Sequence, residues 1–200
     1  MNINIKNLAA TVLVTLFVIT SVTAQKKTKL DIKTNLVLTY SAMGPKGSKV
    51  LFPLEIKEMN DEEVTLEYTM VNGKKKISGK WIISEDGLEK GEYLNWQPLN
   101  PSEERILPKD QTIFSVSRKF FDEIKSKKTA TYDDKVFELK NMPKGEEIKI
   151  GKKIIDAIYV VEKEGELAYW ILNNRDLPFI INTKGSQGPV FTLFEVGTGE

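Results

Sequence analysis

The chain has 200 residues, with 29 basic and 28 acidic side chains, no histidine and no cysteine. The balanced charge argues against binding to nucleic acid or a membrane surface, which needs a concentrated basic excess. Without histidine or cysteine the chain cannot use Ser-His-Asp or Cys-His catalysis, form disulfides or build the usual zinc, copper, haem or iron–sulfur centres. We therefore expect no cofactor and no catalytic residue of these classes.

The first 24 residues are typical of a cleaved secretory signal. Lys6 is the only charged residue before Lys26, and the apolar run LAATVLVTLFVITSV lies between them. This run is short for a bilayer span, and Val22 and Ala24 place small residues where signal peptidase requires them. An uncleaved membrane anchor is the alternative. The sequence predicts cleavage after Ala24, a periplasmic or secreted location, and one domain over residues 25–200 with no transmembrane segment.

Two strands are predicted at the start of this domain. Residues 30–40, LDIKTNLVLTY, alternate between apolar and polar side chains, which is typical of a long, half-buried strand. The segment Gly44–Ser48, GPKGS, predicts a turn into a second strand, Val50–Lys57. Within that strand, Pro53 indicates an edge position or a bulge, because proline cannot donate to a central ladder.

Residues 64–83 predict a β-hairpin centred on Asn72-Gly73, the pair that a two-residue type I′ turn favours. That turn predicts three cross-strand pairs on one buried face: Tyr68 with Ile77, Leu66 with Gly79, and Val64 with Trp81. Turn chemistry and alternation agree on this face.

A long loop and one helix are predicted next. Leu94–Gln111 carries three prolines and no periodicity, so we expect a loop with at most a short pairing at its ends. In Ser117–Lys128 the first serine can cap a helix, lysines suit its carboxyl end, and an apolar stripe follows one side. The stripe consists of Phe120, Phe121 and Ile124. We expect it to pack on strands within residues 153–173, since an isolated helix of this length is marginal.

The C-terminal third predicts strands near residues 135–140, 146–150, 153–163, 166–173, 178–183 and 190–196. Turns are predicted at Glu164-Gly165 and at Lys184–Gly188. The runs IIDAIYVV and LAYWIL are apolar on both faces, so a second layer has to cover them, and the predicted helix is the expected cover.

The most distinctive stretch is AYWILNNRDLPFII, residues 168–181. It predicts a central strand, a turn over NNRD and a second strand that begins at Pro178. The alternative is a ligand cavity lined by Tyr169, Trp170 and Phe179.

Two further aromatic residues, Tyr93 and Trp96, lie at the root of the long loop and within it. Exposed aromatics on a long loop offer contacts for an apolar or amphipathic ligand. In the alternative, Trp96 folds back and closes one open end of the sheet.

Together these elements predict a mainly β fold: a single antiparallel, strongly curved sheet, as in a half-barrel or open barrel, with one short covering helix near Ser117–Lys128. With the signal sequence, the strand meander and the final YWIL…LPFI…FTLFEV, this layout resembles small secreted β-rich proteins of unknown function from Gram-negative bacteria. More distantly it resembles the periplasmic half-barrel that carries lipoproteins or other lipids. The second resemblance implies a lipid or other apolar ligand.

Three functional hypotheses follow. The first is a non-catalytic β module that binds an apolar or amphipathic ligand or an envelope protein. The second is a structural or assembly accessory of the cell envelope. The third is a carboxylate-dependent hydrolase, which needs two carboxylates from different strands in one cleft, because adjacent acids on a strand point to opposite faces. Calcium at the acidic turn YDDK, residues 132–135, is a further alternative.

Overall fold

The computed structural model describes residues 26–43, 47–72, 75–185 and 190–199. The predicted signal sequence lies outside the described residues, as do parts of the turns predicted at Gly44–Ser48, Asn72-Gly73 and Lys184–Gly188. Neither helix within the described ranges has the length and hydropathy that a membrane span needs.

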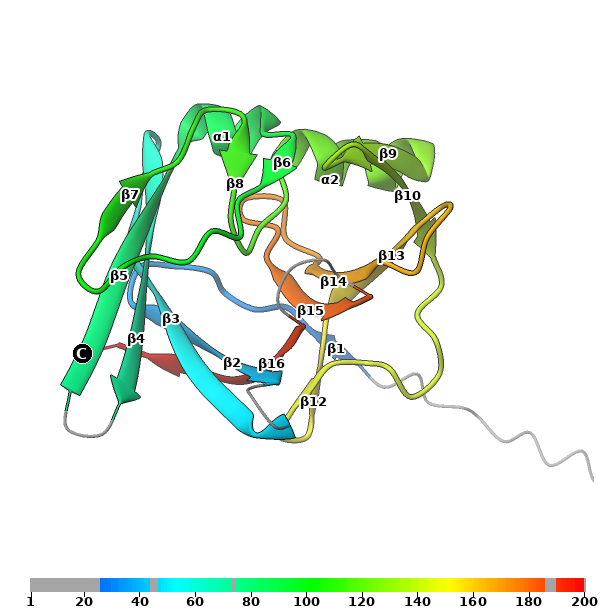
Figure 1. Cartoon of the computed structure of the whole chain (residues 1–200). Helices are drawn as coiled ribbons and strands as arrows, with labels where there is room; N and C mark the ends of the chain where they lie inside the picture. Colours follow the sequence, from blue (N-terminus) through cyan, green and yellow to red (C-terminus); the bar gives the residue numbers. More distant parts are fainter. Residues whose placement is uncertain (1–25, 44–46, 73–74, 186–189, 200) are drawn as a thin grey trace, which may run out of the picture.

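The fold is mainly β, with one large and two small sheets (Figure 1). The large sheet has 11 strands in the order β7 (Glu104–Ile106), β5 (Lys75–Ser84), β4 (Glu63–Asn72), β3 (Lys49–Met59), β2 (Leu36–Met43), β16 (Phe191–Thr198), β15 (Ile180–Lys184), β14 (Ala168–Leu172), β13 (Ala157–Glu162), β10 (Lys135–Lys140) and β9 (Thr129–Tyr132). The small sheets are β1 (Lys27–Thr28), β12 (Lys153–Ile155) and β11 (Lys149–Ile150), and β6 (Tyr93–Leu94) with β8 (Gln111–Thr112).

The mainly β class is confirmed, whereas the prediction of a single antiparallel sheet is wrong. The described residues form three sheets, the large one is not closed into a barrel among them, and the pairs β5–β7, β1–β12 and β6–β8 are parallel. These parallel pairings extend over only two or three residues each, too few for alternation to reveal them. The expected pairing at the ends of the long loop is confirmed as β6–β8, and β7 interrupts the loop between them.

A second helix, α1 (Glu85–Lys90), was not predicted. The Ser84 hydroxyl accepts a hydrogen bond of 3.3 Å from the Gly87 N–H and caps the helix, and two acidic residues follow in its first turn. Gly87 is a poor helix former, but a Cβ there would lie 2.7 Å from the Gln111 carbonyl oxygen. The close approach of α1 to β8 therefore requires glycine at this position. Because glycine disfavours helices, α1 is hard to recognise from the sequence pattern.

Two predicted features of the first strands are corrected. The strand expected over residues 30–40 begins only at Leu36, because Asn35 adopts a φ of 66° that ends the extended conformation before it. Pro53 is not on an edge strand, since β3 lies between β2 and β4. The described β3–β4 pairs begin at Leu54, so Pro53 lies just beyond that ladder and breaks no bond in it.

The β4–β5 hairpin has the predicted buried face but not the predicted register. Asn72 pairs with Lys75, which shifts every pair by two residues and places Tyr68 opposite Gly79 and Leu66 opposite Trp81. A shift of two keeps each side chain on its face, so alternation cannot detect it. The observed register gives the Tyr68 ring space, because a Cβ at Gly79 would lie 2.8 Å from it.

The predicted helix is confirmed as α2 (Arg118–Lys127), capped by Ser117, with Phe120, Phe121 and Ile124 buried. Its aromatic contacts differ from the prediction: Phe120 packs on Tyr132 of β9 and Phe137 of β10, at 5.2 and 5.8 Å between ring centroids. Figure 1 shows α1 and α2 next to each other at the top of the view.

The doubly apolar strand β14 therefore has two different covers. On one face, Tyr169 stacks on Phe137, which in turn contacts α2. On the other face, Trp170 packs on Tyr159, and its Nε1–H donates a hydrogen bond of 3.0 Å to the Glu146 carbonyl. The helix covers only one face, and the chain around residue 146 covers the other.

The turn between β9 and β10 gives a first testable prediction. Asp133 and Asp134 join the paired residues Tyr132 and Lys135, and both have positive φ, 56° and 58°, as a type I′ turn requires. Because this conformation strains residues other than glycine, Asp133→Gly is expected to raise the free energy of unfolding by about 0.5–1 kcal/mol in urea denaturation. Asp110→Gly, in a turn without positive φ at that residue, should instead lower it. Equal effects at both positions would contradict the strain argument.

Candidate functional site

The inner face of the first half of the large sheet is filled by aromatic side chains from distant segments. Phe114, from the segment between β8 and α2, lies at their centre. Its ring centroid is 5.6 Å from those of Tyr40 and Phe191 and 5.8 Å from that of Phe52. Tyr40 and Phe191 are buried, and the Tyr40 hydroxyl donates a hydrogen bond of 3.2 Å to the Ile180 carbonyl. We call Tyr40, Phe52, Phe114 and Phe191 the inner cluster.

Phe114 has an unusual backbone conformation, with a φ of 55°. Positive φ is rare for a bulky residue, so packing around it has to hold it there. The Phe114 carbonyl accepts a hydrogen bond of 2.7 Å from the Ile180 N–H, and Trp81 of β5 meets the Phe114 ring edge-on at 5.7 Å. The strained residue thus ties the two halves of the sheet together through its ring and its backbone.

Trp96 folds back onto the inner cluster. Its ring is half-buried and meets Phe114 at 5.4 Å with an interplanar angle of 86°, and Phe191 at 5.7 Å. These contacts agree with the alternative in which Trp96 closes one end of the sheet.

The other aromatic residues considered as ligand contacts do not share a cavity with Trp96. Tyr169 and Trp170 are buried on opposite faces of β14, and Phe179 is fully buried. Tyr93 is half-buried at a separate place, where its hydroxyl donates to an Asp134 carboxylate oxygen at 3.3 Å. The sequence places these aromatic residues in or near strands but does not show whether their side chains meet. In the fold they lie in different layers.

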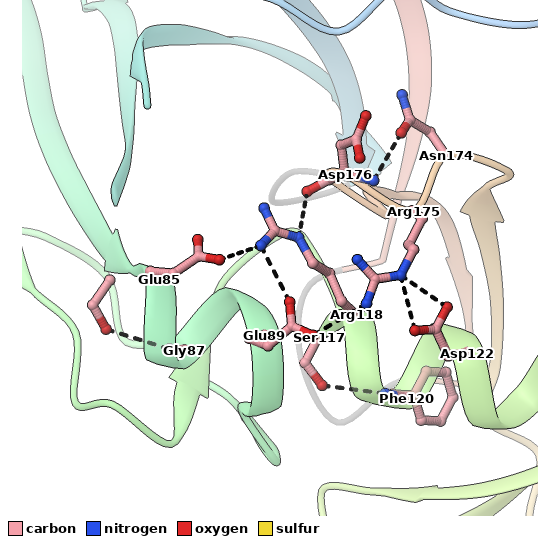
Figure 2. A network of polar contacts seen from close by, with 11 residues as sticks. Glu85, Gly87, Glu89, Ser117, Arg118, Phe120, Asp122, Asn174, Arg175 and Asp176 are labelled. Carbon is pink, nitrogen blue, oxygen red and sulfur yellow. Dashed lines mark hydrogen bonds and ion pairs between the residues drawn. The ribbon is translucent and has the colours of Figure 1, made fainter. Parts of the chain in front are cut away.

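The turn NNRD, residues 173–176, is where the distinctive stretch reaches the surface. Figure 2 shows this turn lying against both helices. The Arg118 guanidinium of α2 donates to the Asp176 carbonyl at 3.1 Å and forms ion pairs with Glu85 and Glu89 of α1. Only 14% of the Arg118 side chain is exposed. We call Glu85, Glu89, Arg118 and Asp176, together with Asp122 and Arg175, the ionic junction.

Arg175 completes the ionic junction from the turn itself. Its guanidinium binds Asp122 of α2 through two hydrogen bonds of 2.9 and 3.1 Å and Glu89 of α1 at 3.1 Å. The hydrogen bond to Asp122 raises the pKa of Arg175 above its usual range, so Arg175 stays charged. Glu89 therefore bridges the two arginines, and the two helices and the turn are held by one network.

The ionic junction holds three elements together. Both of its arginines pair with its acids, Glu85, Glu89 and Asp122. A surface cleft of about 400 Å³ opens beside it, lined by Met59, Asn60, Asp61, Glu85, Arg118 and Asp176. In the described part of the chain, no group of three or more acidic side chains is placed to hold a metal ion.

One surface cleft combines apolar and basic residues. It has a volume of about 350 Å³ and lies beside the carboxyl end of α2. Its apolar lining includes Leu139, Met142 and Ile158, and its lysines are Lys27, Lys128 and Lys140. This cleft is distant in the chain from the long loop at which an apolar ligand was expected to enter.

Three buried tyrosines predict a specific response to alkaline pH. Burial raises the pKa of Tyr40, Tyr132 and Tyr169 well above the usual 10.0. Above about pH 10 the unfolded chain loses these phenolic protons and the folded chain keeps them, so stability falls as pH rises. We expect phenolate absorbance to appear in two phases, with the later phase coinciding with loss of circular dichroism. Tyr40→Phe should make the fall in stability with pH less steep. A single early phase from all tyrosines in the folded protein would contradict this.

Sequence analysis missed α1 and therefore Glu85 and Glu89, although Ser84, two following acids and the terminal Lys90 form a recognisable capping pattern. It also could not place Arg118 and Arg175 together, because 57 residues of chain separate them and nothing in the pattern marks their meeting. Comparisons with protein-family models, curated proteins and solved structures found no match for this chain.

Proposed function

We propose that this protein is a non-catalytic periplasmic or secreted β module that acts through its outer surface, by contact with proteins of the cell envelope, and holds no ligand inside the sheet. The observation that carries this proposal is the filled inner face. A carrier needs a cavity of several hundred Å³ lined mainly by apolar side chains. Here the corresponding space is occupied by the inner cluster and by Trp96.

The surface clefts support the same proposal. Five surface clefts have charged residues in their lining, and none of these five is lined by a residue of the inner cluster. The ionic junction and the buried helix stripe hold α1, α2 and the sheet in one arrangement. A rigid scaffold with a packed interior is typical of a module whose function lies in its surface.

Tryptophan emission provides the test, because two of the three tryptophans, Trp81 and Trp96, touch Phe114. Detergent-free protein is titrated with a long-chain fatty acid and, separately, with short-chain phosphatidylglycerol. We expect no saturable change in emission. Trp96→Ala should unfold at lower temperature than the unchanged protein and should also show no saturable response.

A saturable, one-to-one response in the unchanged protein would overturn the proposal. The location of such binding can be read from two variants. Loss of the response in Trp96→Ala would place the ligand at the inner cluster, and loss in Lys128→Glu would place it in the basic surface cleft.

A further inference from the structure

Exposed apolar side chains are concentrated on the outer face of β2, β3 and β16, away from the inner cluster. Figure 1 shows these three strands side by side at the bottom of the view. Seven large hydrophobic residues are exposed in the described part of the chain, and four of them belong to these strands or adjoin them. They are Met43 (76% exposed), Leu51 (44%), Val190 (50%) and Phe194 (46%). We call these four residues the outer patch.

The register of the strands places Met43 and Leu51 of the outer patch on one face, and alternation from Thr192 places Phe194 on that face too. Val190 adjoins β16 just before its paired residues. Leu51 and Thr192 both pair with Ser41, and Lys49 pairs with Met43. Residues that pair directly across an antiparallel ladder share a face, and alternate residues of one strand do so too. This face is opposite to Tyr40 and Phe52, which point to the inner cluster.

A bulge in β16 exposes Glu195 next to Phe194. Leu193 pairs with Tyr40 and Glu195 pairs with Thr39, so Phe194 is the extra residue between two consecutive pairs. A bulge reorients side chains at a sheet surface, and here Phe194 and Glu195 are both exposed. Without the extra residue, strict alternation after buried Leu193 would direct only every second side chain outwards.

Two charged residues of opposite sign, Lys49 and Glu195, lie next to the outer patch. The Lys49 ammonium lies 3.7 Å from the centre of the Phe194 ring, and Glu195 follows Phe194 in the chain. Neither Lys49 nor Glu195 has an ion-pair partner among the described residues, although most other charges near the helices are paired. An apolar centre flanked by one unpaired cation and one unpaired anion is complementary to itself under a two-fold rotation.

We propose that two copies of this chain associate through the outer patch, with Phe194 near the two-fold axis and Lys49 of each copy facing Glu195 of the other. The sheets stack face to face, as sheets do in β-sandwiches. The outer patch is removed from water on both copies, and each unpaired charge gains a partner. This association does not depend on the proposed contact with envelope proteins.

Charge exchange tests the pairing. Sedimentation velocity of the unchanged protein, from about 1 μM to about 1 mM, is expected to show one chain at the low end and two at the high end. Lys49→Glu and Glu195→Lys should each weaken association by at least about tenfold, because like charges then face one another. A mixture of these two variants should form a complex of two chains. In that mixed complex the glutamate introduced at position 49 of one copy faces the lysine introduced at position 195 of the other. The unchanged Glu195 of the first copy faces the unchanged Lys49 of the second.

The apolar contribution is tested by Phe194→Ser, which should also prevent association. Ile106→Ser is the matched control, because Ile106 is 72% exposed but lies on β7, at the far edge of the sheet. Thermal unfolding of each variant checks that it is folded. Three results would overturn the proposal: a single chain at every concentration of the unchanged protein, association that survives Phe194→Ser, or no complex when the two charge variants are mixed.

Discussion

Replacing Phe191 by alanine is expected to lower the free energy of unfolding by about 3–5 kcal/mol, the usual cost of removing a buried phenylalanine ring. Phe191 is 1% exposed and its ring contacts those of Tyr40, Phe114 and Trp96 at 5.0 to 5.7 Å. Truncation would leave a cavity between residues from four segments of the chain, which cannot close without moving the strained backbone at Phe114.

The matched control is Phe194→Ala, three residues further along β16. Phe194 is 46% exposed, so in dilute protein its truncation is expected to change the free energy of unfolding by less than about 1 kcal/mol. Urea denaturation of both variants measures the difference. If Phe191→Ala were as mild as Phe194→Ala, the inner cluster would not be the close-packed core described above.

Replacing Phe120 by alanine is the second large effect, again about 3–5 kcal/mol. Phe120 is 2% exposed and joins α2 to the sheet through Tyr132 and Phe137. Phe137 in turn stacks on Tyr169 at 5.3 Å, so the loss reaches the central strand β14. We expect lower stability and faster hydrogen exchange of amides in both α2 and β9.

Val136→Ala is the control for this second prediction. Val136 precedes Phe137 on β10 and is 44% exposed, so its truncation should cost less than about 1 kcal/mol. Fast exchange in α2 of the unchanged protein, together with a small effect of Phe120→Ala, would show that the helix is not held on the sheet. In that case the ionic junction could not hold α1, α2 and the turn 173–176 in one arrangement.

Local sequence patterns predicted a large part of this fold. Alternation identified the buried faces of β2, β3 and β4, and the spacing of Phe120, Phe121 and Ile124 identified α2 with its cap at Ser117. These signals succeed because they depend on neighbours in the chain. The side-chain period of a strand or helix is set by backbone geometry and needs no knowledge of what lies opposite.

The remaining errors concern long-range placement. The register of β4 on β5 differs from the prediction by two residues because both registers bury the same face, and the space that Tyr68 needs at Gly79 is visible only in three dimensions. The doubly apolar pattern of β14 correctly required a second layer, and the predicted helix α2 covers one face through Phe137. The cover of the other face, the chain near Glu146, was not predicted.

The same limit applies to the candidate site. Trp96 and Phe114 are 18 residues apart in the chain, and Phe191 is much further away, yet their rings are in contact. Sequence left open whether Trp96 faces a ligand or the core, since either role needs the same residue type in a loop. Only the positions of Phe114 and Phe191 favour the second.

Because the protein's own side chains fill the inner face of the sheet, we expect no lipid to be retained there. Native mass spectrometry of protein purified from its own envelope without detergent, followed by organic extraction of the same sample, measures this. We expect only the masses of one and two polypeptide chains, and no lipid in the extract at a fixed ratio to protein. One lipid per chain, retained by the unchanged protein and lost in Trp96→Ala, would contradict this expectation.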